Sequence, residues 1–402
     1  MTNQADWTIL IYIAAHNNLD GFGTRSRDQI LAAGSTERIK LAVLFDSWQG
    51  ATRQIAPGAG GEPPEPLGNF DSGDPAQLQE TARWAFARCP ANHYGLVLWS
   101  HGSGYWDQAE LRKIAKQARG EMANIEAPER DVAGRSMALF RTTLLKILKA
   151  QDPAERAILF DDGTGHSVDT LELEQVCAAL HQAIGQPLDF LGMDACLMAT
   201  LEVAYQVRQH ARYLVASEEL VPGRSWPYDA ILQKLHAAPQ MSAGDLAAHV
   251  VQDFAAYYEA NPPQLNGGDV TQVALDLTQI EQVSAPLKTL AAALRAHMPN
   301  AYATLHAAQY AAYLKETYAK RREPKRTKFG YHLWDVGTLA AGLAATATQP
   351  DVQQAAAAVA AALQPGPSRA VLAEEHRGEW FAGIGGLSIS LAPPKMPVSS
   401  AY

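Results

Sequence analysis

The sequence predicts an α/β fold in which a mostly parallel sheet carries helices on both faces. Short apolar runs rich in β-branched residues and bounded by polar residues or glycine are typical of fully buried strands. Segments with apolar residues three and four positions apart lie between these runs and favour helices. Because strands and helices alternate along the chain, the strands are expected to run parallel.

The expected elements follow one another in a regular order. Strands are predicted at residues 8–14, 41–45, 95–99, 157–160, 188–191 and 213–216. Helices are predicted at residues 23–34, 75–88, 134–149, 169–184 and 197–209. The segment 56–66, rich in Pro and Gly, predicts a surface loop or the tip of a hairpin.

The character of the chain changes after Asn261-Pro262-Pro263, which predicts a boundary near residue 262. Residues 1–262 form the expected main domain, and residues 263–402 form a carboxyl-terminal α/β subdomain of helical and α+β character. Strands are expected there at 269–275 and 386–391. The alanine-rich stretch 339–363 is interrupted by Gln349-Pro350-Asp351 and therefore predicts two packed helices.

The composition is that of an ordinary globular protein, with 402 residues of which 47% are hydrophobic and 19% charged. A net charge of −9 argues against bulk attraction to nucleic acid or to anionic membranes, so neither is an expected partner. The basic run 320–326 is interpreted as a solvated loop, with a nucleic-acid patch as the weaker alternative. No apolar stretch reaches the roughly 18 residues of a membrane span.

Cysteine usage and the start of the chain bear on the cellular compartment. The chain has 3 cysteines, Cys89, Cys177 and Cys196, which are too few and too scattered for a disulfide framework, so reduced thiols are expected. Residues 1–7 lack the basic and apolar regions of a secretory signal. The expected location is therefore cytoplasmic, with secretion left open.

Two motifs place a histidine and a cysteine just beyond apolar runs that predict strands. They are Trp99-Ser100-His101-Gly102-Ser103-Gly104 and Leu191-Gly192-Met193-Asp194-Ala195-Cys196-Leu197-Met198. Ligands and chemistry in such folds gather at the carboxyl ends of parallel strands. His101 and Cys196 are therefore candidates for a base and a thiol nucleophile that meet there.

Each candidate also has a structural interpretation. Cys196 precedes a predicted helix at 197–209, whose dipole would favour the thiolate, but a buried cysteine that packs as a small hydrophobe is the alternative. Cys89 and Cys177 are assigned to that buried class. His101 followed by Gly102 suits a base beside an oxyanion-binding amide, whereas a hydrogen-bonded histidine at a strand end is the alternative.

Asp194 lies two residues before the candidate nucleophile. One hypothesis is that it caps the following helix. A second is that it lines the bottom of a specificity pocket, where it would meet an Arg or Lys side chain of a substrate.

Three ordered segments, the third of which has two parts, carry a resemblance to a known family. They are Trp7-Thr8-Ile9-Leu10-Ile11-Tyr12-Ile13-Ala14-Ala15-His16-Asn17-Asn18-Leu19-Asp20, His101-Gly102-Ser103-Gly104, Met193-Asp194-Ala195-Cys196-Leu197-Met198 and Glu202-Val203-Ala204-Tyr205. With these motifs the chain resembles the clostripain family of cysteine peptidases, which belongs to the caspase-like α/β clan. The resemblance covers about the first 230 residues best.

The resemblance implies specific roles for residues of this chain. His101 and Cys196 would form a catalytic dyad, and the amides of Gly102 and Cys196 would form the oxyanion hole. The family cleaves after Arg or Lys, so the implied partner is a peptide or protein with one of these residues at the cleaved position. The implied S1 pocket consists of the acid Asp194 and the walls Ser217, Glu218 and Trp226. The alternative for Trp226 is that it packs in the hydrophobic core and does not contact a substrate.

The resemblance also bears on cofactors and maturation. The dyad requires no cofactor, and no metal site is assigned. Calcium is an expectation by resemblance only, because some members use it. Asp161-Asp162 would offer carboxylates, although adjacent acids at a strand end are more often solvated or capping. Some members cleave themselves between the histidine and the cysteine, and the basic segment 107–135 contains bonds of the right type.

Rival functions come from other classes. A catalytically inactive caspase-like protein that serves as a binding or scaffold module is the main alternative. A nucleotide-binding module is disfavoured because the sequence has no G-x-x-x-x-G-K-[ST] loop. A serine hydrolase is disfavoured because it has no G-x-S-x-G elbow.

Overall fold

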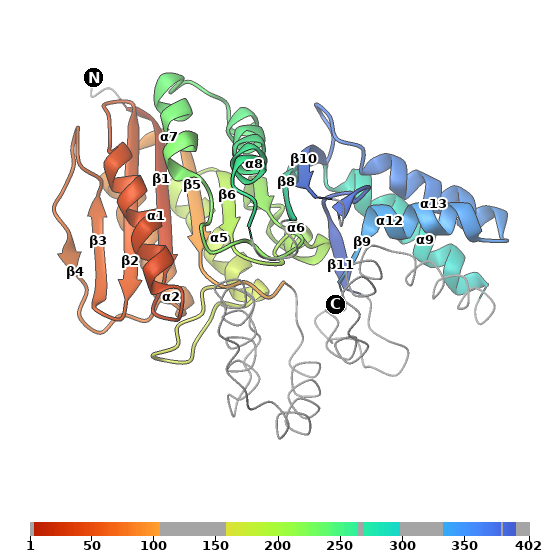
Figure 1. The fold of residues 1–402 in the computed structure, drawn as a ribbon, viewed down its shortest axis with the longest axis horizontal. Coiled ribbons are helices and arrows are strands. Elements are labelled where there is room, and N and C mark those ends of the chain that lie inside the picture. Colours follow the sequence, from red (N-terminus) through yellow and green to blue (C-terminus); the bar gives the residue numbers. More distant parts are fainter. Residues whose placement is uncertain (1–3, 105–157, 264–268, 298–332, 379–380, 391–402) are drawn as a thin grey trace.

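The computed structural model describes residues 4–104, 158–263, 269–297, 333–378 and 381–390. Among these residues, nine strands form one sheet in the order β10-β8-β7-β6-β5-β1-β2-β3-β4 (Figure 1). The strands are β1 (Ala5–Ala14), β2 (Ile39–Ser47), β3 (Gly50–Ile55), β4 (Glu65–Pro66), β5 (Ala91–Trp99), β6 (Leu188–Asp194), β7 (Ala211–Ala216), β8 (Val270–Asp276) and β10 (Val371–Arg377). The five central strands β2, β1, β5, β6 and β7 are parallel, which confirms the predicted fold class.

Helices cover both faces of this sheet (Figure 1). One face carries α1 (Asp20–Ala33), α7 (Tyr228–Ala237) and α8 (Ala243–Ala260), and the other carries α2 (Pro75–Arg88), α5 (Thr170–Ile184) and α6 (Leu201–Val207). The start of α5 shows why the sequence folds this way locally. Asp169 accepts a hydrogen bond from the Glu172 amide while the Glu172 side chain accepts one from the Asp169 amide, which satisfies two amides at the helix end.

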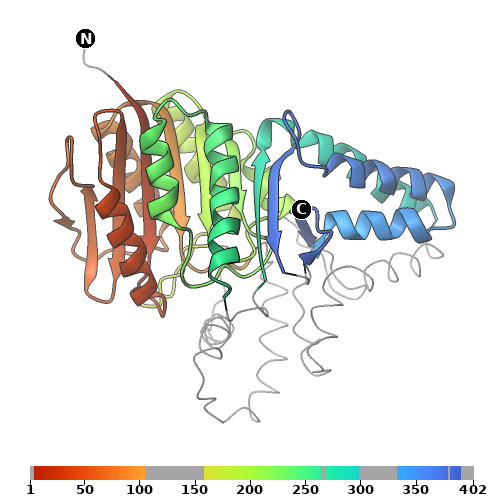
Figure 2. The same cartoon turned by 45° about the horizontal axis from the view of Figure 1, so that its top comes forward.

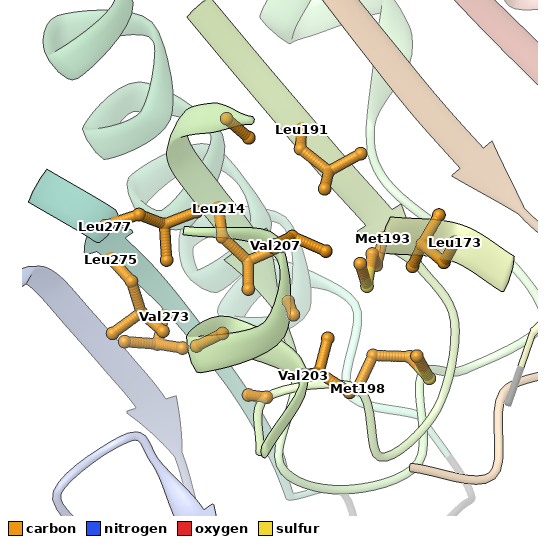
Figure 3. Packing of buried hydrophobic residues seen from close by; sticks show 14 of the residues in the cluster. Leu173, Leu191, Met193, Met198, Val203, Val207, Leu214, Val273, Leu275 and Leu277 are labelled. Carbon is orange, nitrogen blue, oxygen red and sulfur yellow. The ribbon is translucent and has the colours of Figure 1, made fainter. Parts of the chain in front are cut away.

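The central strands are buried on both faces, which explains their continuous apolar runs. On β6, Leu191 and Met193 belong to one hydrophobic cluster and Phe190 to the other. Figure 3 shows Leu191 and Met193 packed beside side chains from α5 and α6. The residues that carry the candidate chemistry therefore extend from a rigid core.

The carboxyl-terminal region continues the same sheet, because β8 pairs antiparallel with β7 and β10 pairs antiparallel with β8. The described residues beyond β8 include a short η3 turn (Leu277–Gln279). They also include the packed helices α9 (Glu281–Ala296), α12 (Val336–Thr346) and α13 (Pro350–Ala362), in which α13 contacts both of the others (Figure 2). The two packed helices predicted for the alanine-rich stretch are thus confirmed. Strands β9 (Leu333–Asp335) and β11 (Ser388–Ser390) form a separate antiparallel pair. A domain boundary near residue 262 stays a prediction.

Both outer strands of the large sheet are poor templates for further pairing. The outer strand β10 carries Glu374, Glu375, His376 and Arg377 in sequence. At the other side, β4 has only 2 residues, one of which is Pro66. Charges, proline and short length are the features by which edge strands avoid aggregation.

Two predicted elements differ in the structure. The expected strand at 157–160 is replaced by isolated bridges, in which Ile158 pairs with Gly102 and with Val168 rather than with the sheet. The helix expected at 197–209 begins only at Leu201. The predictions for 107–135, 134–149 and 320–326 lie outside the described residues. No helix within the described ranges has the length and apolarity that crossing a membrane requires.

Candidate active site

The register of β5 and β6 brings the two candidate catalytic residues to one edge of the sheet. Trp99 pairs with Asp194 in this parallel pair, and His101 and Cys196 each follow two residues later. Both residues are buried, with 4% and 8% of their surface exposed. The backbone therefore places both motifs at the carboxyl ends of neighbouring strands, as the sequence predicted.

Gly102 brings the histidine segment into direct contact with the cysteine segment. A Cβ atom built on Gly102 would lie 2.4 Å from the Cys196 carbonyl oxygen and 3.0 Å from the Ala195 Cβ. Real Cβ atoms do not approach a carbonyl oxygen so closely, so this position requires glycine. The missing side chain allows the His101-Gly102 backbone to lie against the residue that carries the thiol.

His101 is held in place by Asn18, which lies within the first family motif but to which the sequence assigned no role. Its Nε2 lies 2.6 Å from Asn18 Oδ1, and its ring meets Phe160 edge to face at 6.4 Å between centroids. An amide oxygen only accepts hydrogen bonds, so Nε2 carries the proton, and in the neutral ring Nδ1 is the basic nitrogen. Asn18 follows β1, which neighbours β5, and this adjacency was the signal that could have identified it.

The Cys196 thiol is covered by apolar side chains. Cys196 forms a small buried cluster with Leu197, Leu220 and Leu333, and Val221 packs against it. The Val221 amide donates a hydrogen bond to Sγ at 3.3 Å. Burial raises the pKa of the Cys196 thiol to about 12, and the charges of Glu219 and Asp194 act in the same direction.

The expectation that a helix dipole activates Cys196 is wrong. Helix α6 begins at Leu201, and Thr200 is its N-cap, whose side chain accepts a hydrogen bond from the Val203 amide at 3.2 Å. Between Cys196 and Thr200 the chain is not helical, because Leu197 has φ 65° and its amide donates to the Glu219 carbonyl at 3.1 Å. The hypothesis that Asp194 caps this helix is wrong for the same reason.

Asp194 is buried and anchors the loop that follows β7. Its Oδ2 accepts hydrogen bonds from the Ser225 hydroxyl, from the Trp226 amide at 3.2 Å and from the Tyr228 hydroxyl at 2.9 Å. Burial raises the pKa of Asp194 to about 6, although these three donors lower it in part. Its other oxygen, Oδ1, has no hydrogen-bond partner among the described residues.

The three residues expected to form the walls of the S1 pocket are also buried. The Ser217 hydroxyl donates to the Thr271 carbonyl at 2.8 Å. The Glu218 carboxyl is 1% exposed, and its pKa is raised well above the usual range by burial and then by Asp335. Trp226 packs edge to face against Phe190 in the core, which matches the alternative left open for it.

Cys89 and Cys177 pack as buried residues, and Asp161 has a capping role, as the structural interpretations of these residues predicted. All three cysteines lie among the described residues, are buried and form no disulfide. Asp161 accepts hydrogen bonds from the amides of Gly163 at 2.8 Å and Thr164 at 3.1 Å, so it caps a turn. Among the described residues, the group of possible metal ligands that includes it is His16, Asp46 and Asp161. One imidazole and two carboxylates supply fewer than the six to eight oxygen ligands that calcium takes, so calcium stays an expectation from the resemblance.

Comparison with known proteins relates this geometry to a family. The model of the clostripain family matches residues 146–360, which is more than half of the chain and includes Cys196. Clostripain from Hathewaya histolytica is 36% identical over 97 residues, which cover 22% of this chain and 18% of clostripain. The aligned part therefore spans less than a fifth of that protein.

Solved structures share the fold at low sequence identity. A secreted C11 cysteine protease from Bacteroides thetaiotaomicron, in complex with an irreversible peptide inhibitor, matches with a TM-score of 0.63 and 17% identity, covering 98% of this chain and 95% of that one. An inactive zymogen C11 protease from Parabacteroides distasonis matches with a TM-score of 0.56 and 16% identity, covering 99% and 95% of the two chains.

Proposed function

Because the chain belongs to the clostripain family of cysteine peptidases, we propose that it hydrolyses peptide bonds with Cys196 as nucleophile and His101 as base. The observation that carries the proposal is the parallel register of β5 and β6, which sets both residues at one sheet edge. The close approach of Gly102 to the Cys196 carbonyl also supports the proposal, because it shows that the two segments are in contact.

The proposed reaction proceeds through a thioester. The Cys196 thiol gives its proton to His101 Nδ1 while sulfur attacks the substrate carbonyl carbon, and the carbonyl electron pair moves to oxygen. The C–N bond then breaks as His101 returns the proton to the leaving nitrogen, which leaves an acyl thioester. Water, deprotonated by His101, attacks the thioester, the C–S bond breaks and the thiol regains its proton. The products are a carboxylic acid and an amine.

The amides of Gly102 and Cys196 are the proposed oxyanion hole. A carbonyl that is attacked gains negative charge on its oxygen, and two fixed amide donors stabilise that charge. The close approach of the two segments at Gly102 supports this assignment, because it brings the backbones that carry both amides together.

The buried thiol implies that substrate binding or processing must open the site. With a pKa of about 12, only about one Cys196 thiol in 10⁵ is ionised at pH 7. The hydrogen bond from the Val221 amide and the cover of Leu220 and Leu333 oppose access. We expect Leu220 and Val221 to move when a substrate binds, so that the thiol loses its proton to His101 during attack.

Peptide hydrolysis tests the dyad. Short peptides that end in Arg or Lys at a reporter amide should be hydrolysed by the native chain and not by the Cys196→Ala or His101→Ala variants. Cys89→Ala is the matched control, because Cys89 is another buried cysteine that lies at the end of α2. Equal rates for the native chain and Cys196→Ala would remove the assignment.

Cleavage after Arg or Lys requires an acid that meets the basic side chain. Asp194 supports this role through its unpartnered Oδ1, and Glu218 offers a second buried carboxyl beyond β7. Asp194→Asn should abolish the preference for Arg and Lys if Asp194 reads the substrate, and Glu218→Gln should do so if Glu218 does. A preference retained in both variants would show that another acid is responsible.

Self-cleavage between His101 and Cys196 is the second part of the proposal. The relative from Parabacteroides distasonis is described as an inactive zymogen, and a covered thiol is in keeping with a form that needs activation. Mass spectrometry of the purified native chain should find fragments cut within 107–135 that are missing from Cys196→Ala. The same fragments in both proteins would point to an external protease.

A binding or scaffold protein without turnover is the alternative, and the raised pKa of Cys196 is the observation in its favour. A peptide electrophile that carries arginine distinguishes the two functions. A peptidase should be labelled at Cys196 much faster than at Cys89, whereas a scaffold should show no difference between the two thiols.

No cofactor is needed for the proposed chemistry, so added calcium should leave the rate of hydrolysis unchanged. A cytoplasmic location remains a prediction that these relatives do not support, because the protease from Bacteroides thetaiotaomicron is described as secreted.

A further inference from the structure

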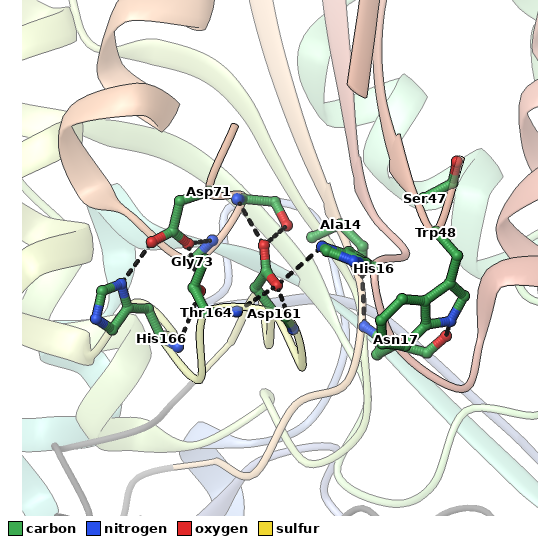
Figure 4. Close-up of polar contacts among 12 residues, drawn as sticks. Ala14, His16, Asn17, Ser47, Trp48, Asp71, Gly73, Asp161, Thr164 and His166 are labelled. Carbon is green, nitrogen blue, oxygen red and sulfur yellow. Dashed lines mark hydrogen bonds and ion pairs between the residues drawn. The ribbon is translucent and has the colours of Figure 1, made fainter. Parts of the chain in front are cut away.

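Three possible metal ligands meet at the carboxyl ends of β1 and β2, away from the thiol. His16 follows β1, Asp46 lies near the end of β2, and Asp161 comes from the loop after Phe160. One donor atom from each residue lies within 4.8 Å of the other two. Figure 4 shows His16 and Asp161 directed toward each other from these two segments.

The hydrogen bonds within this cluster do not use every atom that could coordinate a metal ion. His16 Nδ1 lies 3.1 Å from Asp161 Oδ1 but does not form a hydrogen bond with it or with any other described residue. Asp46 is 2% exposed, and its Oδ2 is buried without a hydrogen-bond partner among the described residues. His16 is paired with Asp161 at that distance, but Asp46 Oδ2 has neither a hydrogen-bond partner nor an ion-pair partner among the described residues. Buried polar atoms are nearly always satisfied, so this one carboxylate oxygen points to a missing ligand.

We propose that His16, Asp46 and Asp161 bind a divalent transition-metal ion, for which Zn²⁺ is the test case. One imidazole and two carboxylates suit Zn²⁺ better than calcium or magnesium, which prefer oxygen ligands alone. Ligands about 2.0 Å from a tetrahedral ion are about 3.3 Å apart. The 3.1 Å between His16 and Asp161 is therefore close to a ligand-to-ligand spacing.

The surroundings hold the ligands in place before an ion arrives. Trp48 meets the His16 ring edge to face at 4.4 Å between centroids. A Cβ atom at Gly163 would lie 2.3 Å from the His16 ring, so glycine allows the turn after Asp161 to close against it. Asp161 in turn accepts hydrogen bonds from the amides of Gly163 and Thr164, as ordered metal ligands commonly do.

The charge of the cluster also favours a cation. Asp46 and Asp161 are two buried carboxylates, and His16 is the one basic group among the described residues of the cluster. A bound dication would stabilise both carboxylates in their ionised form.

This site would fix the loop that holds the candidate base. Asn17 donates from its side chain to the Phe160 carbonyl at 2.7 Å, and the Asp162 amide donates to the His16 carbonyl at 2.9 Å. Asn18, the next residue, accepts from His101. An ion shared by His16 and Asp161 would clamp the same two segments, independently of whether Cys196 acts as a nucleophile.

Calorimetry on the purified chain of 402 residues, stripped with a chelator and dialysed, tests the proposal. Titration with Zn²⁺ alone should show one site that is lost or weakened more than about tenfold in His16→Ala and in the isosteric Asp46→Asn. Tryptophan fluorescence should change on addition of Zn²⁺ and stay unchanged in Trp48→Phe, while calorimetry still finds the site in that variant. Circular dichroism establishes that each variant is folded.

The matched control is His166→Ala, which removes an exposed histidine that pairs with Asp71 near the same turn. This variant should bind Zn²⁺ as the native chain does. No binding by the native chain, or equal binding by His16→Ala and Asp46→Asn, would overturn the site. Tighter binding of Ca²⁺ than of Zn²⁺ would overturn the assignment to a transition metal.

Discussion

Gly102→Ala adds a single methyl group at the point where the histidine and cysteine segments touch. The new Cβ would lie 2.4 Å from the Cys196 carbonyl oxygen and 3.0 Å from the Met198 Cγ. Ordinary contacts between non-bonded heavy atoms are about 3.5 Å, so the two segments must separate by about 1 Å. Little room exists on the other side, because Gly102 also pairs with Ile158.

The cost can be estimated from the size of this displacement. Overpacking of this kind destabilises a folded chain by about 1–3 kcal/mol. A displacement of about 1 Å between catalytic groups lowers catalysis by about 100-fold. We therefore expect Gly102→Ala to fold with a lower free energy of unfolding and to lose most of its kcat/KM toward peptides ending in Arg or Lys.

Urea denaturation followed by circular dichroism measures the first quantity, and hydrolysis of a reporter peptide measures the second. Gly21→Ala is the matched control, because a Cβ at Gly21, which lies in α1, has no atom within 4 Å. That variant should keep native activity and gain up to about 1 kcal/mol, since alanine favours a helix. Native stability together with native kcat/KM in Gly102→Ala would refute the packing described for this contact.

Three further predictions concern buried groups near the same edge. The pKa of Asp194 is about 6 in the folded state against an ordinary value of 3.8. The folded state therefore binds this proton more tightly than the unfolded state does, which stabilises the fold at low pH. That stabilisation is lost as the pH rises from about 4 to above 6. Asp194→Asn removes the effect, and its free energy of unfolding relative to the native chain should rise by about 2 kcal/mol between pH 4 and pH 7; a constant difference would contradict the raised pKa. Cys196 and Cys177 both have pKa values of about 12, so iodoacetamide at pH 7.5 should label them at least about a thousandfold more slowly than in the urea-unfolded chain. Peptide mapping measures the labelling of each cysteine, and rapid labelling of Cys196 would disprove its burial. Thr200→Ala should be about 1 kcal/mol less stable in urea than Thr200→Ser, which keeps the capping hydroxyl of α6, and equal stabilities would show that the cap contributes nothing.

The sheet and the positions of His101 and Cys196 were predictable because they depend on local pattern and on one general rule. Continuous apolar runs identified β1, β2, β5, β6 and β7, and parallel strands bring the residues beyond their carboxyl ends to a common edge. His101 and Cys196 could therefore be placed together from their positions after two strands. The run at 157–160 shows the limit of the pattern, since Ile158 is buried without joining the sheet.

The surroundings of these two residues depend on contacts between distant parts of the chain and were not predictable. The helix propensity of 197–209 suggested an early helix start, but Leu197 and Ala199 instead donate hydrogen bonds to the chain at Glu219 and Ser217. The burial of Asp194 depends on Ser225, Trp226 and Tyr228, about 30 residues away. Propensity is a weak guide wherever such tertiary partners decide the backbone.

The antiparallel addition of β8 and β10 to the sheet has a consequence for shortened forms of the protein. If the chain were cut near residue 262, β7 would lose its neighbour β8 and would present a bare row of amides and carbonyls to solvent. Its newly exposed residues Leu214, Val215 and Ala216 carry none of the charges that shield β10. Such a fragment would be prone to pair with other copies of itself through this strand, so residues 1–262 are expected to aggregate when they are produced without the carboxyl-terminal region.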